Sequence, residues 1–330
     1  MSTGNAIDWR RLHGQSFQGQ RVLITGGAGF IGSHLAEKLS ALGASVVVID
    51  DLSGGSRENI APFEHVEFVQ ASILDRDAVA NATRGCRYVF HQAALGSVPR
   101  SVEQPRLYND VNTTGTLNVL EAARAAGVGR VMFAASSSAY GPNPVPWIET
   151  MPTRAKSPYA ATKVAGEALL QAYSASYGLD TACLRYFNVF GPRQNANSAY
   201  AAVIAAFAKA ILAGQRPVIF GDGEQSRDFT FIDNVVQANL LAARREAAIG
   251  GEVINVGCGG RISVNELAEK VAQTLKRPDL KPIHQPERTG DIKHSFADLA
   301  RAKAILGYEP ITGFQPGLEQ TLGWYRSVLA

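Results

Sequence analysis

The stretch RVLITGGAGFIGSHL, residues 21–35, decides the fold of this 330-residue chain. Its apolar residues 22–24 predict a buried strand, its glycines a tight turn, and residues 30–42 a helix that stops at Gly43. Glycines let the turn and the helix N-terminus approach a pyrophosphate, whose charge the backbone N–H groups and the helix dipole stabilise. The spacing fits both G-x-G-x-x-G and G-x-x-G-x-x-G, so it does not select one subtype of dinucleotide-binding turn.

Two acidic residues follow the next predicted strand. Residues 46–49, Val-Val-Val-Ile, read as this strand, and Asp50 and Asp51 come directly after it. A carboxylate at that strand end accepts hydrogen bonds from ribose hydroxyls and repels a 2′-phosphate, which favours NAD over NADP as the cofactor. The alternative is that Asp50 only begins a turn.

A phenol and an ammonium lie four residues apart in the run SPYAATK, residues 157–163. Ser157 is a good N-cap and Pro158 a good first helical residue, so Tyr159 and Lys163 share one face near a helix start. A positive charge about 4 Å away, at an effective dielectric of roughly 20, favours the phenolate by about 4 kcal/mol, or about three pKa units. This pair predicts a base, although such spacing also occurs by chance on surface helices.

A serine-rich segment, FAASSSAYG at residues 133–141, leaves a predicted strand at its carboxyl end. Sheets of this kind bind ligands at that end. A hydroxyl there can hydrogen-bond the reacting oxygen of a substrate and pass its proton toward Tyr159. The alternative reading is an ordinary serine-rich turn.

Strand-like and helix-like segments alternate along the chain, which predicts an α/β fold with a doubly wound, Rossmann-type parallel sheet. The further predicted strands are 66–70, 88–92, 131–135, 181–186 and 252–256, with helices that include 109–126 and 157–177. After residue 192 the pattern breaks into Pro- and Gly-punctuated pieces, which indicates a smaller C-terminal α/β substrate lobe. We therefore expect an N-terminal arm at 1–19, a nucleotide-binding domain at 20–192 plus about 229–257, and a substrate lobe made of 193–228 and 258–330.

The charge and composition of the chain argue against several classes of function. The net charge is only +3 without a basic block, which argues against nucleic acid or an anionic membrane surface as a partner. The three cysteines have no metal or redox spacing, and the histidines have no ligand spacing, so we expect a cytoplasmic protein with reduced thiols and no metal. Residues 1–19 lack the apolar core of a signal peptide, and the apolar segment 199–212 is too short to span a bilayer. Segments 108–126 and 159–173 carry apolar residues on more than one face, which suits a homodimer or burial within the monomer.

From about residue 20 to its end, the chain resembles the extended short-chain dehydrogenase/reductases that act on nucleotide sugars. Within that family it is similar to the NAD-dependent UDP-sugar 4-epimerases, specifically those that accept N-acetylated hexosamines. The stretches that carry the resemblance are 25–32, 91–100 (HQAALGSVPR), 136–141, Tyr159 with Lys163, 185–191 (RYFNVFG), 221–223, 227–228 and 288–291 (RTGD).

The resemblance implies roles for individual residues. It implies that Ser136, Tyr159 and Lys163 are catalytic, with a one-residue ambiguity toward Ser137. NAD is expected to contact Gly26, Gly29, Phe30, Ile31, Gly32, Asp50, Ser72, Ile73, Gln92, Ala93, Ala94, Tyr159, Lys163 and Tyr186, the last beside the nicotinamide. A UDP-sugar is expected to contact Gly96, Ser97, Ser136, Ser137, Asn188, Val203, Phe220, Arg227, Arg288, Asp291 and Ser295. Within this set the resemblance assigns Phe220 to uracil, Arg227 and Arg288 to the diphosphate, and Asp291 to the uridine ribose.

Two residues depart from the pattern of the family. Ser72 stands where many relatives have an Asp that binds the adenine amino group, which puts that contact in doubt. Ser295 stands where bacterial glucose/galactose epimerases have a bulky Tyr beside the hexose. The smaller side chain leaves room for an acetamido group, so we expect UDP-N-acetylglucosamine and UDP-N-acetylgalactosamine as substrates.

The expected reaction is epimerisation at C4 through a 4-keto sugar, with Tyr159 and Ser136 moving the proton and NAD the hydride. UDP-glucose is the alternative substrate. A 4,6-dehydratase or a uronate decarboxylase shares the first oxidation. In dehydratases of this family, however, an Asp-Glu pair stands where this chain has Ser137 and Ser138. Uronate decarboxylases generally carry a Glu in this segment, which this chain also lacks. A non-catalytic NAD-binding sensor is the alternative from a different class. The retention of Ser136, Tyr159 and Lys163 argues against it.

Overall fold

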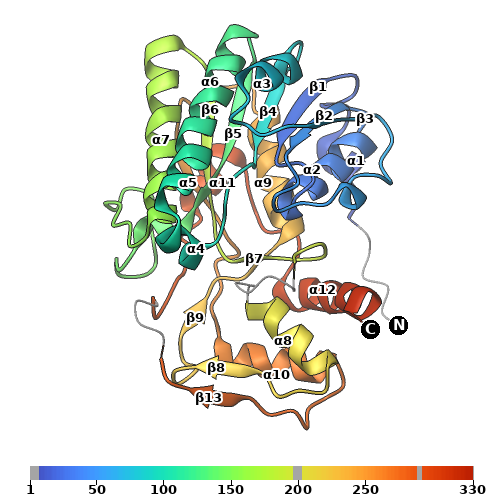
Figure 1. The fold of residues 1–330 in the computed structure, drawn as a ribbon, viewed down its shortest axis with the longest axis vertical. Helices are drawn as coiled ribbons and strands as arrows, with labels where there is room; N and C mark the ends of the chain where they lie inside the picture. The colour runs from blue at the N-terminus through green and yellow to red at the C-terminus, as the bar shows by residue number, and fades with distance from the viewer. Residues whose placement is uncertain (1–6, 196–202, 288–291, 330) are drawn as a thin grey trace.

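A seven-stranded parallel sheet forms the centre of the computed structural model, which describes residues 7–195, 203–287 and 292–329 (Figure 1). Its strand order is β11-β6-β5-β4-β1-β2-β3. The strands are β1 (Arg21–Thr25), β2 (Ser45–Asp50), β3 (Val66–Gln70), β4 (Tyr88–His91), β5 (Arg130–Ser136), β6 (Thr181–Tyr186) and β11 (Val253–Val256). The order reverses between β1 and β4, and this topology confirms the predicted doubly wound fold. A crevice at such a reversal is where sheets of this type bind ligands.

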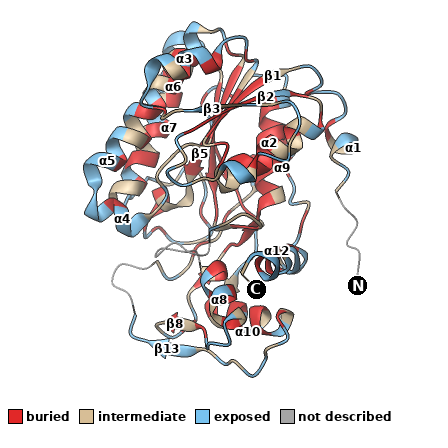
Figure 2. Ribbon diagram, turned by 45° about the vertical axis from the view of Figure 1, so that its right-hand side comes forward, coloured by how far each residue is buried: buried red, intermediate tan, exposed pale blue. Residues whose placement is uncertain are grey.

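The middle strands of the sheet are apolar on both faces. Leu23 of β1 pairs in register with Val47 of β2 and Val89 of β4, and all three side chains are fully buried. A parallel sheet with buried faces needs helices on both sides, and Figure 2 shows buried strands between layers of helices. The unbroken apolar runs of the sequence are therefore the cause of the three-layer architecture.

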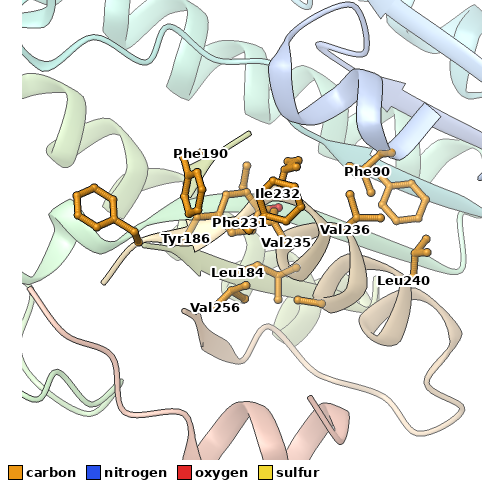
Figure 3. Close-up of a cluster of buried hydrophobic side chains, with 14 of the residues drawn as sticks. Phe90, Leu184, Tyr186, Phe190, Phe231, Ile232, Val235, Val236, Leu240 and Val256 are labelled. Carbon is orange, nitrogen blue, oxygen red and sulfur yellow. The ribbon is translucent and has the colours of Figure 1, made fainter. Parts of the chain in front are cut away.

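Helices α2 (Phe30–Ala41) and α9 (Ile232–Arg244) cover one face of the sheet, and α11 (Ala300–Leu306) lies against β11 and α9. Helices α3 (Arg76–Thr83), α6 (Gly115–Ala125) and α7 (Pro158–Tyr177) cover the other face. Figure 3 shows the core beneath α9, where Val236 and Leu240 approach Phe90 and Leu184 of the sheet. Burying these large apolar side chains supplies about 1.5–3 kcal/mol each before the entropy of folding is subtracted.

The helix expected over residues 109–126 is present, but it contains a π-helical turn that the sequence did not indicate. The structure has two short helices, α4 (Val98–Glu103) and α5 (Pro105–Asn109), then a π-helical turn at residues 110–114 before α6 begins. The side chain of Asn112 explains why this turn is held: its Oδ1 accepts from Leu95 N, and its Nδ2 donates to Leu95 O and Thr162 Oγ1. These bonds tie the turn to the loop after β4 and to α7.

The smaller part of the molecule lies at one end of the large sheet (Figure 1). It contains three two-stranded pairings, β10 with β7, β12 with β9, and β13 with β8. Its elements are β7 (Val189–Phe190), α8 (Val203–Leu212), β8 (Val218–Phe220), β9 (Ser226–Arg227), β10 (Thr230–Phe231), β12 (Ile262–Ser263), α10 (Val264–Thr274), β13 (Ile283–Gln285) and α12 (Phe314–Leu329). The proposed domain boundaries within this part of the chain stay a prediction.

The segment predicted as an N-terminal arm packs onto the large domain from residue 7 onward. It forms helix α1 (Trp9–His13), and Phe17 after it is fully buried. The Nε2 atom of His13 lies 2.8 Å from Oε1 of Gln237 on α9. Trp9, His13 and Phe17 recur every four residues, an aromatic helical period that the polar composition of the segment obscures. In the described residues, we find no helix with the length and apolar character needed to cross a membrane.

Candidate active site

The glycine-rich turn between β1 and α2 is closely packed on itself. Gly26 has a φ of +66°, and a Cβ added there would lie 2.7 Å from the backbone of Ala93. A Cβ on Gly32 would lie 2.2 Å from the carbonyl oxygen of Gly26. Helix α2 begins directly after this turn, and its first N–H groups have no partner within the helix. Because Phe30 and Ile31 of that first turn line a large cavity, the turn fits the diphosphate of NAD.

Asp50 connects the end of β2 to the glycine-rich turn. Its Oδ2 accepts a hydrogen bond from Ala28 N at 3.0 Å, and its Oδ1 accepts one from Leu52 N at 2.8 Å. Burial raises the pKa of this carboxyl, and the backbone donors oppose the increase. Two oxygens offer about four acceptor positions, so the carboxylate can hold the turn and still accept from ribose hydroxyls.

A cavity of about 1750 Å³ lies between the carboxyl ends of β4, β5 and β6, the first turns of α2 and α7, and helix α8. Side chains from the large domain and from the smaller part both line it. Of the residues predicted from the sequence, the lining contains Phe30, Ile31, Gln92, Ala94, Gly96, Ser136, Ser137, Tyr159, Lys163, Tyr186, Asn188, Arg227 and Ser295. The structure therefore brings the serine-rich segment, the Tyr/Lys pair and the start of α2 to one space.

The other predicted residues lie elsewhere. Gly26, Gly29, Gly32 and Asp50 form the glycine-rich turn and its support, whereas the cavity lining does not include Ser72, Ile73, Ala93, Ser97, Val203 or Phe220. The hydroxyl of Ser72 accepts from Leu74 N, and that of Ser97 caps α4. Arg288 and Asp291 lie outside the described residues.

Lys163 is almost fully buried at the cavity wall. Its Nζ donates to the carbonyl oxygen of Ala134 at 2.9 Å and lies 5.9 Å from the ring centre of Tyr159. Burial lowers the pKa of Lys163 to about 8, and the nearby Glu167 carboxylate opposes this decrease. Ser157 caps α7 through a bond from Ala160 N, as the sequence indicates.

The acidity of Tyr159 differs from the prediction. Burial raises the pKa of its phenol in the protein alone, and a hydrogen bond from Ser136 opposes the increase. The expected net decrease of this pKa is therefore wrong, because burial outweighs the contributions that favour the phenolate. The sequence indicates that the charge lies near the phenol, but it does not show that Lys163 is buried and Tyr159 half-buried in the folded chain.

Ser136 is held in one orientation by its neighbour. Ser138 N and Ser138 Oγ both donate to Ser136 Oγ, at 3.2 and 2.9 Å. A hydroxyl oxygen has two lone pairs, so these two bonds leave the proton of Ser136 to be donated. Since Ser136 also acts on the pKa of Tyr159, the geometry favours Ser136 over Ser137 as the serine that works with the phenol.

Asn188 and Ser295 lie together at the cavity wall formed by the smaller part. Asn188 Nδ2 donates to Ser295 Oγ at 3.1 Å and to the carbonyl oxygen of Asp228 at 3.2 Å. Ser295 is 5% exposed, so its side chain is a fixed part of the wall. Deeper in the cavity, the Tyr186 hydroxyl donates to Gln92 Oε1 and accepts from Asn239 Nδ2.

Sequence reasoning missed several cavity residues. Val98, Lys156, Gln194, Lys209 and Gln215 also line the space. A signal for one of them was visible, because Lys209 is the charged residue within the otherwise apolar helix α8. Among the residues that the structure describes, no group of three or more His, Cys, Asp or Glu side chains is arranged to bind a metal ion.

The chain is similar to known proteins along nearly its whole length. It is 42% identical over 313 residues to a UDP-glucose 4-epimerase of Mycolicibacterium smegmatis, covering 93% of this chain and 99% of the relative. The structure of the UDP-N-acetylglucosamine 4-epimerase from Methanobrevibacter ruminantium superposes with a TM-score of 0.90 at 41% identity, covering 94% and 99% of the two chains. The UDP-glucose 4-epimerase from Thermotoga maritima gives a TM-score of 0.89 at 38% identity, covering 94% and 100%.

Residues 22–257 match the family described as NAD dependent epimerase/dehydratase. This match extends from the first residues of β1 to the end of β11, and it includes the glycine-rich turn and the serine, tyrosine and lysine of the cavity. It confirms the resemblance found in the sequence and the assignment of NAD as cofactor. The chain belongs to the NAD-dependent epimerase/dehydratase family.

Proposed function

We propose that this protein is a UDP-sugar 4-epimerase whose substrates are the UDP-N-acetylhexosamines, UDP-N-acetylglucosamine and UDP-N-acetylgalactosamine. The observation that carries the proposal is the placement of Ser136, Tyr159 and Lys163 at the wall of one cavity that also reaches the N-terminus of α2. A half-buried phenol beside a hydroxyl and an amine is suited to exchanging a proton with a sugar hydroxyl. The similarity to epimerases over the full chain supports the same reaction.

In the proposed mechanism, Tyr159 removes the proton from the hydroxyl at C4 of the sugar. When bound, NAD would supply the acceptor for the hydride of C4 and the source from which it comes back. Ser136 donates a hydrogen bond to the oxygen that loses the proton, because its own oxygen is occupied by Ser138. Lys163 favours the phenolate of Tyr159 by its charge. The keto-sugar then turns so that its opposite face receives the hydride, and Tyr159 returns the proton.

The walls of the cavity suggest where the substrate is held. Arg227 lines the cavity from β9, and its Nη1 donates to the carbonyl oxygens of Ser226 and Lys293. These bonds orient a guanidinium, a group whose fork of donors matches phosphate oxygens. We assign Arg227, with Arg288, to the diphosphate and Asp291 to the uridine ribose. Phe220 is assigned to uracil, although in the protein alone it does not line the cavity.

The choice of acetylated sugars rests on the small residues at the hexose end. Gly96 and Ser295 line that end of the cavity, and a Cβ on Gly96 would meet no atom within 4 Å. Both positions therefore leave space for an acetamido group. UDP-glucose is the alternative substrate, and the names of two relatives favour it.

A dehydratase or decarboxylase is less well supported by the geometry. Dehydration requires an acid that protonates the leaving hydroxyl. Of the described residues that line the cavity, Glu103 is the only one with a carboxylate, and it lies at the end of α4 rather than beside Ser136. The positions after Ser136 are Ser137 and Ser138.

The test is to incubate the purified protein separately with UDP-glucose, UDP-N-acetylglucosamine and UDP-N-acetylglucosaminuronate and to resolve the products. Interconversion of the acetylated gluco and galacto forms is expected, whereas conversion of UDP-glucose alone would refute the substrate assignment. Loss of water or of CO₂ from a substrate would identify the alternative reactions. Tyr159→Phe is expected to abolish turnover and retain NAD, because the ring stays in place. Equal activity of this variant would refute the role of the phenol.

Ser295→Tyr tests the hexose end directly. The ring would have to occupy space at the cavity wall, and overpacking of this kind costs about 1–3 kcal/mol, or about 5- to 150-fold in kcat/KM. We expect this loss for the acetylated sugar and a smaller loss for UDP-glucose. An equal loss for both sugars would remove Ser295 from the specificity argument.

A further inference from the structure

Asp228, which lies between β9 and β10, is fully buried and bound from two other segments of the chain. Its Oδ1 accepts from Cys258 N at 2.9 Å, and its Oδ2 accepts from Gly259 N at 3.1 Å and from Ala297 N at 3.3 Å. The donors are all main-chain N–H groups, and none of the ion pairs found in the described part of the chain includes Asp228. The carboxylate thus joins the segment after β11 to the segment that carries Ser295.

The main chain of the same residue contacts the hexose end of the cavity. Asp228 N donates to the carbonyl oxygen of Ser295 at 3.0 Å, and the carbonyl oxygen of Asp228 accepts from Asn188 Nδ2 at 3.2 Å. Asn188 in turn donates to the hydroxyl of Ser295. Both ends of Asp228 therefore act on the two polar residues that line this wall.

There is little room for Asp228 to move. A Cβ added to Gly257 would lie 2.7 Å from Asp228 Oδ2 and 2.9 Å from Ala297 Cβ. A glycine is thus required at residue 257 for the carboxylate to reach the N–H of Ala297. The bond from Ala297 N to Asp228 therefore keeps residues 295–297 at a fixed distance from β9.

We propose that Asp228 is a positioning residue whose ionised carboxylate holds residues 295–297 and so fixes Ser295 and Asn188 in the hexose pocket. This inference rests on the proposed function, since it assigns the hexose to that end of the cavity. A carboxylate accepts from all three N–H groups at once. A protonated acid or an amide places a donor opposite one of them, which weakens the hold on the segment.

The ionisation state of Asp228 can be changed by varying the pH within a range that is accessible in enzyme assays. Burial raises the pKa of its carboxyl to about 6, with the three N–H groups opposing the increase. The titratable groups that face it are Cys258, whose pKa burial raises to about 11, and Tyr308, whose pKa burial raises well above its usual value. Both are neutral near pH 7. Arg227, Lys293, Asp298 and His294, which pairs with Ser226 Oγ, are the other charged or titratable groups of the adjoining segments.

Asp228→Asn in the full-length, NAD-loaded protein tests the proposal. We expect the KM for the UDP-sugar to increase about tenfold at pH 8, with a smaller change in kcat, because the loss of a charged hydrogen bond acts on the hexose wall and leaves Tyr159 unchanged. The affinity for UDP alone and the NAD content should change less than threefold. Asp298→Asn is the matched control, since its Oδ1 accepts from Ala300 N at the start of α11 and an amide oxygen can accept the same bond.

The pH dependence separates positioning from a merely structural role. In the wild type, the KM should be constant above pH 7 and increase as the pH falls through about 6, where the carboxylate is protonated. In Asp228→Asn the KM should be high and independent of pH, whereas His294→Asn should keep the wild-type dependence. If Asp228→Asn does not fold, the dependence of KM on pH in the wild type and in His294→Asn still tests the proposal. A KM that is flat between pH 5 and 7, or a dependence that disappears in His294→Asn, would overturn the proposal.

The proposed function can fail separately. Absence of turnover with every UDP-sugar would refute the 4-epimerase assignment. Turnover with equal KM values for the wild type and Asp228→Asn at pH 8 would refute only the role of Asp228.

Discussion

Replacing Lys163 with Met tests how the phenol of Tyr159 is activated. Methionine has a similar length and no charge, so the change removes the ammonium with little loss of packing. The ammonium lies 5.9 Å from the ring centre of Tyr159. With the phenolate charge placed at the ring centre and an effective dielectric of roughly 20, a unit charge at this distance favours the phenolate by about 3 kcal/mol, or about 2 pKa units. The fraction of phenolate at a fixed pH below the pKa should therefore decrease about 100-fold.

The assay is the dependence of kcat on pH between 6 and 10 for the wild type and Lys163→Met. The variant should be about 100-fold slower at pH 7, and the gap should narrow above pH 8, because the wild type then loses the ammonium charge of Lys163, whose pKa is about 8. Lys270→Met, which removes a surface lysine of α10, is the control and should follow the wild-type profile. An equal loss at every pH, with normal NAD content, would refute activation through the phenol pKa.

The same variant should be more stable than the wild type. Burial holds the pKa of Lys163 near 8 in the folded state, against 10.5 as its ordinary value. The unfolded chain therefore binds more protons between these values, and the free energy of unfolding rises with pH across this window. Below pH 8 the full cost is present, about 3 kcal/mol for a shift of this size. Chemical unfolding at pH 7 should show Lys163→Met to be more stable by an amount of this order, and the difference should vanish above pH 10.

Three further predictions concern the cofactor turn, the serine segment and acid stability. Gly32→Ala should lose most of its NAD, because the new Cβ would lie 2.2 Å from a backbone oxygen of the turn. The control Gly323→Ala should retain NAD, because there is open space around its Cβ. Equal NAD content of the two variants, measured by absorbance of denatured extracts, would contradict this prediction. Ser138→Ala should lower kcat about tenfold with little effect on KM, since it frees Ser136 to rotate, and Ser138→Thr should restore activity in the same assay. Burial lowers the pKa of His91 to about 3. Below pH 6.5 the unfolded chain therefore binds a proton that the folded protein does not, and the free energy of unfolding should decrease as the pH falls. In His91→Asn, the melting temperature should depend less on pH between pH 6.5 and 4.

Much of the fold was predictable because the sheet is buried on both faces. The strands at 66–70 and 181–186 begin and end where the sequence predicts, although the first is an edge strand of half-buried and exposed residues and only the second is fully buried. The π-helical turn at residues 110–114 within the helix expected over 109–126 was not predictable, because the bonds of Asn112 to Leu95 and Thr162 join segments distant in sequence. Periodicity within a helix does not report such contacts.

The candidate site was predictable where its residues follow one another along the chain. Ser157 and Pro158 fix the start of α7, and this start in turn places Tyr159 and Lys163. The acidity of Tyr159 could not be predicted, because it depends on burial by segments that the local sequence does not include. The role inferred for Asp228 was hidden for a similar reason, since its donors come from segments about 30 and 70 residues away.

In a 4-epimerase the keto-sugar must rotate within the site, so the enzyme has to bind the hexose weakly and the diphosphate firmly. The polar groups at the hexose end meet this requirement, because Asn188 and Ser295 bond each other and both bond the main chain of Asp228. A wall whose hydrogen bonds are already made gains little from any one orientation of the sugar. The wall must nevertheless stay in place while the sugar rotates, or C4 would lose its position against Tyr159. The buried carboxylate of Asp228 supplies this rigidity from behind the wall, without offering the sugar a charge to hold.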